Sequence, residues 1–155
     1  MEKELRFSEA VLQVIRKSFV FDGRARRKEF WSWSLFSALL NILATVAVMM
    51  TTSSSTAQTS VSLILSLLMF FPSLSVTVRR LHDVNRSGWW IGGYYIGIVV
   101  YTIFAIIGSG AMKFVLILSI LFLLAALCWG ILLLVWNFTE GTHGPNIYGK
   151  DPKRD

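Results

Sequence analysis

Charged residues are missing from three long stretches of this chain, and this distribution constrains the fold more than any other feature. Residues 30–78, 87–112 and 114–139 contain no Asp, Glu, Lys or Arg, and together they make up 101 of the 155 residues. A helix needs about 20 largely apolar residues to cross the roughly 30 Å hydrocarbon core of a bilayer. The first stretch is long enough for two such helices, and each of the others for one. The sequence therefore predicts four membrane spans, at about 30–50, 61–78, 89–107 and 114–137.

The composition agrees with a membrane protein. Apolar residues make up 54% of the chain and charged residues only 15%, whereas soluble domains usually carry about a quarter charged residues. The net charge of +6 does not indicate nucleic-acid binding, because the basic residues gather at the ends of predicted spans and not on one face of a soluble domain. The single Cys128 cannot form an internal disulfide and indicates no metal site. We expect neither a metal nor a cofactor.

The basic residues also predict which way the chain crosses the membrane. Fourteen of the fifteen Lys and Arg fall in three segments that four spans would place on the same side, and only Lys113 lies elsewhere. Basic segments next to spans stay in the cytoplasm, so we expect both termini to be cytoplasmic. Trp129 lies about two turns inside the fourth span and should face the other helices. The other tryptophans fall at the predicted cytoplasmic edge, where indole rings are favoured: Trp31, Trp33, Trp89, Trp90 and Trp136.

Segments outside the spans have their own predicted structure. Within the N-terminal segment 1–29, residues 7–20 have apolar positions at helical spacing opposite polar and basic ones. This helix either lies in the cytoplasmic headgroup layer or packs on the cytoplasmic loops of the protein itself. The tail 138–155 is rich in Gly and Pro and should form turns. The predicted fold is thus all-α: a four-helix transmembrane bundle over 30–137, with an amphipathic interfacial helix before it and a turn-rich cytoplasmic tail.

Four further local expectations concern the connections and the third span. The uncharged segment 51–60, TTSSSTAQTS, is predicted to be an external loop, and RRLHDVNRSG from Arg79 is predicted to be a cytoplasmic loop. Asp22 is a candidate N-cap for the first span. In the third span, two overlapping small-xxx-small spacings indicate close helix packing, either within the chain or in a homodimer; they are formed by Gly88, Gly92, Gly93 and Gly97.

Three motifs stand at the predicted cytoplasmic ends of the spans. They are FDGRARRKEFW at 21–31, RRLHDVNRSGWW at 79–90 and GTHGPNIYGKDP at 141–152. In order and spacing they resemble the DUF805 family of small bacterial inner-membrane proteins. The resemblance implies a four-helix protein of the bacterial cytoplasmic membrane with cytoplasmic ends. It implies no biochemical activity.

All three motifs are predicted on the same membrane face, so they could form one site. Guanidinium groups can hold a phosphate bidentately, and basic residues are attracted to acidic lipid surfaces. We therefore predict a cytoplasmic pocket that binds anionic lipid headgroups or an acidic segment of a partner protein. The alternative is that these residues only anchor the topology. The predicted binding residues are Arg24, Arg27, Arg79, Arg80, Arg86, Trp89 and Trp90, with His82, Asp83 and Ser87 organising the loop.

Two other functions are less well supported by the sequence. An enzyme would need His82 as a general base oriented by Asp83, but adjacent residues rarely point the same way, and no activated nucleophile or metal-ligand cluster accompanies them. We predict no catalytic residue. A small channel or transporter would need a path lined by Ser, Thr and Asn41, whereas ion pumps ordinarily use ionisable groups within the membrane. Interhelical hydrogen bonding explains these polar residues more simply.

Overall fold

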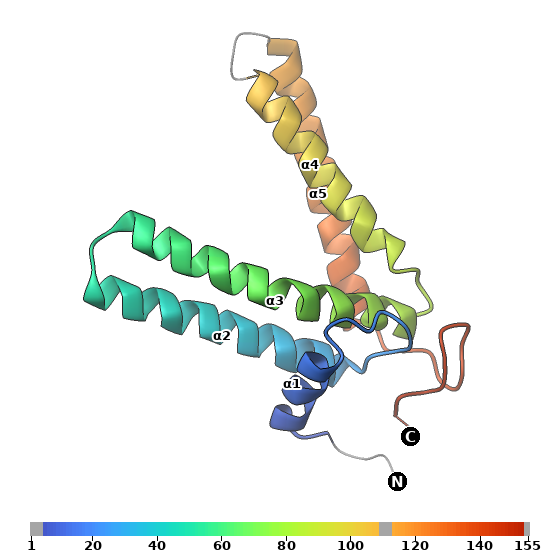
Figure 1. Cartoon of the computed structure of the whole chain (residues 1–155). Helices are drawn as coiled ribbons and strands as arrows, with labels where there is room; N and C mark the ends of the chain where they lie inside the picture. Colours follow the sequence, from blue (N-terminus) through green and yellow to red (C-terminus); the bar gives the residue numbers. More distant parts are fainter. Residues whose placement is uncertain (1–4, 109–112, 154–155) are drawn as a thin grey trace.

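The computed structural model describes residues 5–108 and 113–153 of the chain. In these ranges the chain forms five helices and no strand beyond an isolated bridge between Asn146 and Gly149. The helices are α1 (Phe7–Arg16), α2 (Arg27–Thr51), α3 (Ser55–Asp83), α4 (Trp89–Gly108) and α5 (Lys113–Phe138) (Figure 1).

Four of these helices, α2 to α5, are long and apolar enough to cross a membrane. The prediction of four apolar helices from the charge-free stretches is therefore confirmed. Large apolar side chains are exposed along all four helices, as on a surface that lipid covers. Residues 139–153 contain no helix and make turns.

The α3 helix is longer at both ends than the sequence predicted. It begins at Ser55, so the expected loop over 51–60 is wrong except for residues 52–54. The Ser54 hydroxyl accepts a hydrogen bond from the Ala57 amide and caps the helix, and no Gly or Pro stops the chain from winding there. At the other end, the expected loop from Arg79 is also wrong, because α3 continues to Asp83.

Asp22 does not cap α2, contrary to expectation. The N-cap is Arg26, and the carboxylate of Glu29 accepts a hydrogen bond of 3.1 Å from the Arg26 amide. A carboxylate at this third helical position satisfies an amide that would otherwise lack a partner at the helix start. The same arrangement begins α1, where Glu9 accepts from the Arg6 amide at 3.1 Å. Asp22 instead lies in the linker between α1 and α2, which passes the C-terminal end of α3.

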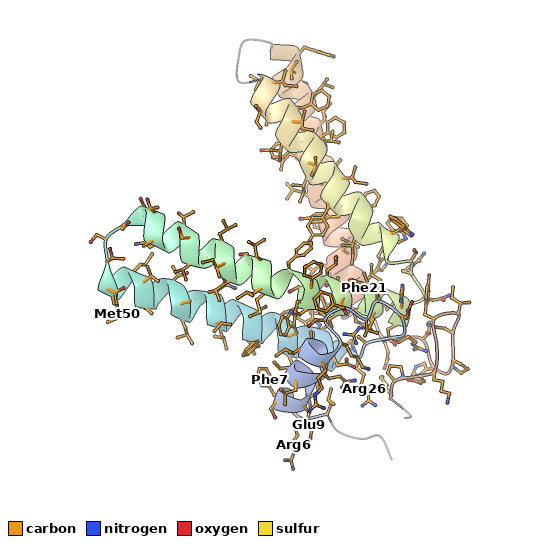
Figure 2. The ribbon with its side chains drawn as sticks, viewed as in Figure 1. Arg6, Phe7, Glu9, Phe21, Arg26 and Met50 are labelled. Carbon is orange, nitrogen blue, oxygen red and sulfur yellow. The ribbon has the colours of Figure 1, made fainter. Side chains whose placement is uncertain are left out.

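The long helices pack in two pairs and not as one bundle (Figure 1). α2 and α3 lie side by side as one hairpin, α4 and α5 form a second, and the two hairpins diverge from a common base that also holds α1 and the tail. Figure 2 shows Arg26 at this base and Met50 at the far end of the first hairpin. The expected four-helix bundle is therefore wrong. In lipid, apolar helix faces gain little free energy when they exchange contacts with acyl chains for contacts with one another. Apolar burial therefore does not bring the two hairpins together.

α1 packs its buried Val11 and Val14 against Ala25, Trp33 and Val76. Of the two alternatives for this segment, packing on the protein itself describes one of its faces, with partners on α2 and α3 as well as in the linker. A second apolar face remains exposed and is formed by Leu12, Ile15 and Phe19. The helix ends at Arg16, earlier than residue 20, and the Ser18 hydroxyl donates to the Ile15 carbonyl at 2.6 Å.

One predicted glycine contact lies inside the second hairpin. A Cβ atom at Gly93 would stand 2.8 Å from Cζ2 of Trp129, so only glycine lets α4 approach the indole ring this closely. The Trp129 indole N–H donates to the Trp90 carbonyl at 2.9 Å. Trp129 therefore faces another helix, as the sequence predicted. Gly88 similarly faces Val78 of α3, whereas a Cβ at Gly97 would have nothing within 4 Å. A homodimer through α4 stays a prediction.

We expect Gly93→Leu to lower the free energy of unfolding by about 1–3 kcal/mol, because the added side chain must push Trp129 away from Trp90. Gly97→Leu makes the same chemical change one turn further along α4, next to open space, and should change stability by less than about 0.5 kcal/mol. Thermal unfolding of the purified protein in detergent micelles measures both. Equal loss of Tm in the two variants would contradict this packing.

Candidate functional site

The three sequence motifs meet at the base of the two hairpins, around the carboxylate of Asp83. Arg24 donates from Nε to Asp83 Oδ1 at 2.9 Å, and Arg80 donates from Nη1 to Asp83 Oδ2. The three side chains are at most 5% exposed. One carboxylate thus pairs with both guanidinium groups away from water, where an unpaired charge would be strongly unfavourable.

The same two arginines hold the C-terminal tail. Arg24 donates to the carbonyls of Gly144 at 2.6 Å and Thr142 at 2.5 Å, and Arg80 donates to the carbonyl of Thr139. The Thr142 amide donates to the Asp83 carbonyl at 2.9 Å. These bonds satisfy donors that the single carboxylate cannot, since each guanidinium carries five N–H groups. The tail is therefore docked by these hydrogen bonds and forms part of the base.

Gly141 allows this close approach. A Cβ atom at this position would fall on the carboxylate of Asp83, so no residue with a side chain fits without moving the tail or the ion pair. Gly141 is itself buried. The glycine that opens the third motif thus has a steric role that sequence spacing did not reveal.

A second buried ion pair joins α3 to the start of α2. Arg79 Nη1 lies 3.5 Å from Glu29 Oε2, and the two side chains are 1% and 2% exposed. The Arg79 carbonyl accepts from the Ala25 amide at 3.0 Å, which ties the linker to α3 as well. Within the described chain, Nη2 of Arg79 is buried without a hydrogen-bond partner. Arg79 and Arg80 therefore face the protein interior.

His82 faces away from Asp83. Its Nδ1 lies 3.1 Å from the Gly23 carbonyl oxygen, to which it donates, and its ring stacks on Tyr148 with centroids 3.9 Å apart and planes 2° apart. The His82 carbonyl accepts from the Asn146 side-chain amide at 2.9 Å. Because Asp83 is engaged by the two arginines, it does not orient His82 as a general base would require. His82 instead links the linker, α3 and the tail.

The remaining predicted binding residues lie outside this network. Arg27 is exposed, with its Nη2 3.9 Å from Glu140, and Arg86 is exposed with its guanidinium 5.0 Å from the Trp136 ring centroid. Trp89 is 84% exposed, whereas Trp90 packs against Trp129 and Trp136. The Ser87 hydroxyl accepts from the Trp89 amide at 3.3 Å, which starts α4. The structure thus divides the expected arginine and tryptophan pocket between a buried network and separate surface groups.

An open cavity of about 430 Å³ lies beside the network, between α1, the linker and the tail. Four basic side chains line it, Lys17, Arg24, Arg26 and Lys150, together with the carboxylate of Glu29. We call it the basic pocket. The rest of its lining is Leu5, Gln13, Gly23, Gly149 and Pro152.

Sequence reasoning missed three of these basic residues. Lys17 stands on the polar side of an amphipathic helix, Arg26 precedes α2, and Lys150 lies in the tail, more than 120 residues away. No spacing in the chain connects them, and only the docking of the tail brings them together. Arg26 takes part in that docking, since its Nε donates to the Pro152 carbonyl.

Many hydroxyl and amide groups within the spans bond to their own helices. Asn41 Nδ2 donates to the Ser37 carbonyl at 3.0 Å, and the Thr77 and Thr102 hydroxyls donate to carbonyls four residues earlier at 2.6 and 2.9 Å. An exception is the Trp33 indole N–H, which donates to the Ser73 hydroxyl at 2.9 Å between α2 and α3. In the described part of the chain, no group of three or more His, Cys, Asp or Glu could hold a metal ion.

Comparison with known proteins relates the chain to membrane proteins of Escherichia coli. The sequence profile of a family described as "Protein of unknown function (DUF805)" matches residues 18–150. Inner membrane protein YhaI of strain K12 is 32% identical over 142 residues, covering 92% of this chain and 93% of YhaI. Inner membrane protein YhaH is 29% identical over 143 residues, covering 92% and 94%. No solved structure matches the chain significantly.

We expect Asp83→Asn to lower the free energy of unfolding by about 3–5 kcal/mol, because it leaves Arg24 and Arg80 charged and buried without a carboxylate. Glu140→Gln is the matched control. Glu140 is an exposed acid whose pKa is lowered by a hydrogen bond and positive charge from Lys153 and by Arg27, and solvent-exposed ion pairs of this kind contribute little to stability. Chemical denaturation in detergent measures both, and equal destabilisation would contradict the central role of Asp83.

Gly141→Ala should release the tail, because its methyl group cannot share space with the Asp83 carboxylate. We expect the segment after Phe138 to be cut by a protease at least tenfold faster than in the unmodified protein, with the helices still intact. Mass spectrometry of the fragments during limited proteolysis gives this rate. A tail that stays equally protected would show that the close approach at Gly141 is not required.

Proposed function

This chain belongs to the DUF805 family of inner-membrane proteins, and we propose that it binds the phosphate-bearing headgroups of anionic phospholipids in the basic pocket. The observation that carries this proposal is the convergence of four basic side chains from three separate segments on one cavity. The proposal also assigns this face to the cytoplasm, since fourteen of the fifteen basic residues lie in the segments on that side.

The chemistry of the pocket suits a phosphate. Guanidinium groups offer paired N–H donors to phosphate oxygens, and ammonium groups act as compact positive charges. The one carboxylate in the lining, Glu29, already accepts from the Arg26 amide and pairs with Arg79, so its charge is offset. In the described part of the chain, no ion pair uses the ammonium groups of Lys17 or Lys150. The pocket therefore carries a net positive charge.

Two features support a membrane lipid as the source of the phosphate. The exposed apolar face of α1, with Leu12 and Ile15, suits insertion into the membrane interface, which would place Lys17, the residue that follows the helix, at headgroup depth. The position of Lys17 is also fixed, because its carbonyl accepts from the buried Ser75 hydroxyl of α3 at 2.6 Å. A lysine whose backbone is fixed in this way is preorganised to receive a headgroup.

In this proposal the buried arginines act indirectly. Arg24 lines the pocket but also holds Asp83 and two tail carbonyls, so it joins the pocket wall to the central ion pair. Arg80 holds the tail that carries Lys150. Their substitution would therefore disturb the pocket together with the fold, whereas Lys17 and Lys150 report on binding alone.

We expect Lys17→Gln combined with Lys150→Gln to reduce the retention of phosphatidylglycerol by about tenfold or more, since each basic residue near an anionic lipid surface contributes about 1 kcal/mol. Lys28→Gln combined with Lys153→Gln removes the same charge from residues outside the pocket lining and should reduce retention much less. Native mass spectrometry of protein released from nanodiscs that contain phosphatidylglycerol and phosphatidylcholine counts the bound lipids.

Equal retention in the two double variants would reject the pocket and leave only a general attraction of the basic surface for anionic lipid. An acidic segment of a partner protein would offer similar charges. Displacement of phosphatidylglycerol by a poly-glutamate peptide, and not by inorganic phosphate, would indicate such a partner instead of a lipid.

A further inference from the structure

A second cavity of about 560 Å³ lies where α3 and α4 diverge. Figure 2 labels Phe21 at this junction, between the two hairpins. We call it the crevice. Its chemistry differs from that of the basic pocket, because most of its lining is apolar and, among the described residues, Asp22 supplies its one carboxyl group.

The apolar part of the crevice follows one face of α3. Phe70, Leu74 and Val78 line it at intervals of four residues, and His82 continues the same row at the base. Twelve residues of helix correspond to about 18 Å, so the crevice extends from the charged base well into the membrane-spanning part of α3. On α4 the facing residues include Gly92, which has no side chain to fill the space.

The polar end of the crevice is formed by Asp22, His82 and Ser87. Asp22 is exposed, and no ion pair in the described part of the chain uses its carboxylate. His82 already donates from Nδ1 to the Gly23 carbonyl. A ligand in the crevice would therefore meet an unpaired negative charge at the aqueous end and hydrocarbon at the other.

From this juxtaposition we propose that the crevice binds an aminophospholipid, with an acyl chain along the apolar face of α3 and the headgroup ammonium at the Asp22 carboxylate. The apolar lining faces the lipid phase between two membrane-spanning hairpins, where acyl chains are the available apolar molecules. Trp89, 84% exposed at the rim, adds an aromatic face that attracts a cationic nitrogen.

Charge complementarity separates this ligand from the one proposed for the basic pocket. An anionic lipid such as phosphatidylglycerol would bring a second negative charge to Asp22, which like-charge repulsion disfavours. The ammonium of phosphatidylethanolamine neutralises it. The two cavities share no lining residue and have opposite local charge, so each can be tested without the other.

The test compares lipids retained by the full chain from nanodiscs with equal amounts of phosphatidylethanolamine and phosphatidylglycerol, by native mass spectrometry. Asp22→Asn should reduce phosphatidylethanolamine retention about fivefold or more and leave phosphatidylglycerol retention, which reports on the basic pocket, unchanged. Glu140→Gln removes the same charge from an exposed acid outside the crevice and should change neither.

A second variant tests the apolar part. Gly92→Leu places a side chain in the crevice, and we expect it to displace phosphatidylethanolamine while the thermal stability of the protein is kept. Unchanged phosphatidylethanolamine retention in Asp22→Asn or in Gly92→Leu would overturn the proposal. The proposal would also be overturned if the protein retained phosphatidylglycerol instead of phosphatidylethanolamine. Protection of Trp89 from chemical labelling by a second copy of the chain would overturn it as well.

Discussion

The structure depends on the buried carboxylate of Asp83 and the two guanidinium groups that it balances. Arg24 comes from the linker before α2 and Arg80 from α3, and both also bind carbonyls of the tail. One acid therefore connects segments separated by more than a hundred residues. A buried charge network of this kind gains little net energy, because desolvation offsets the attraction. Its effect is on specificity, since an arrangement that buried these side chains apart from one another would leave their charges unpaired.

The base of the molecule and its membrane spans are held together by different interactions. At the base, ion pairs, hydrogen bonds and the small cores around Val14 and Leu81 join α1, the hairpins and the tail. Along the spans, most packing lies within each hairpin, as at Gly93 and Trp129, although Phe70 of α3 meets Tyr95 of α4 with ring centroids 6.4 Å apart. Lipid competes for every apolar surface in the membrane, so only polar groups or close steric fits can join helices there. The divergence of the hairpins and the crevice between α3 and α4 follow from this contrast.

The sequence predicts the spans well and the site only in part. Charge-free stretches longer than about 20 residues are a physical signature of bilayer crossing, so the four apolar helices could be found without any structure. Helix ends were harder to predict, because RRLHD looks like a loop by its charges but winds as the last turns of α3, where the tail satisfies its arginines. The three motifs do meet at the base of the hairpins. Their burial could not be foreseen, because it depends on the approach of Gly141 to Asp83.

The docked tail also has a consequence for biosynthesis. During translation Arg24 and Arg80 are made more than 50 residues before the carbonyls that receive them, since those carbonyls belong to Thr139, Thr142 and Gly144. Until then the guanidinium groups keep their water, and the base stays hydrated and open. The base of the hairpins can therefore take its final form only after the tail has been synthesised.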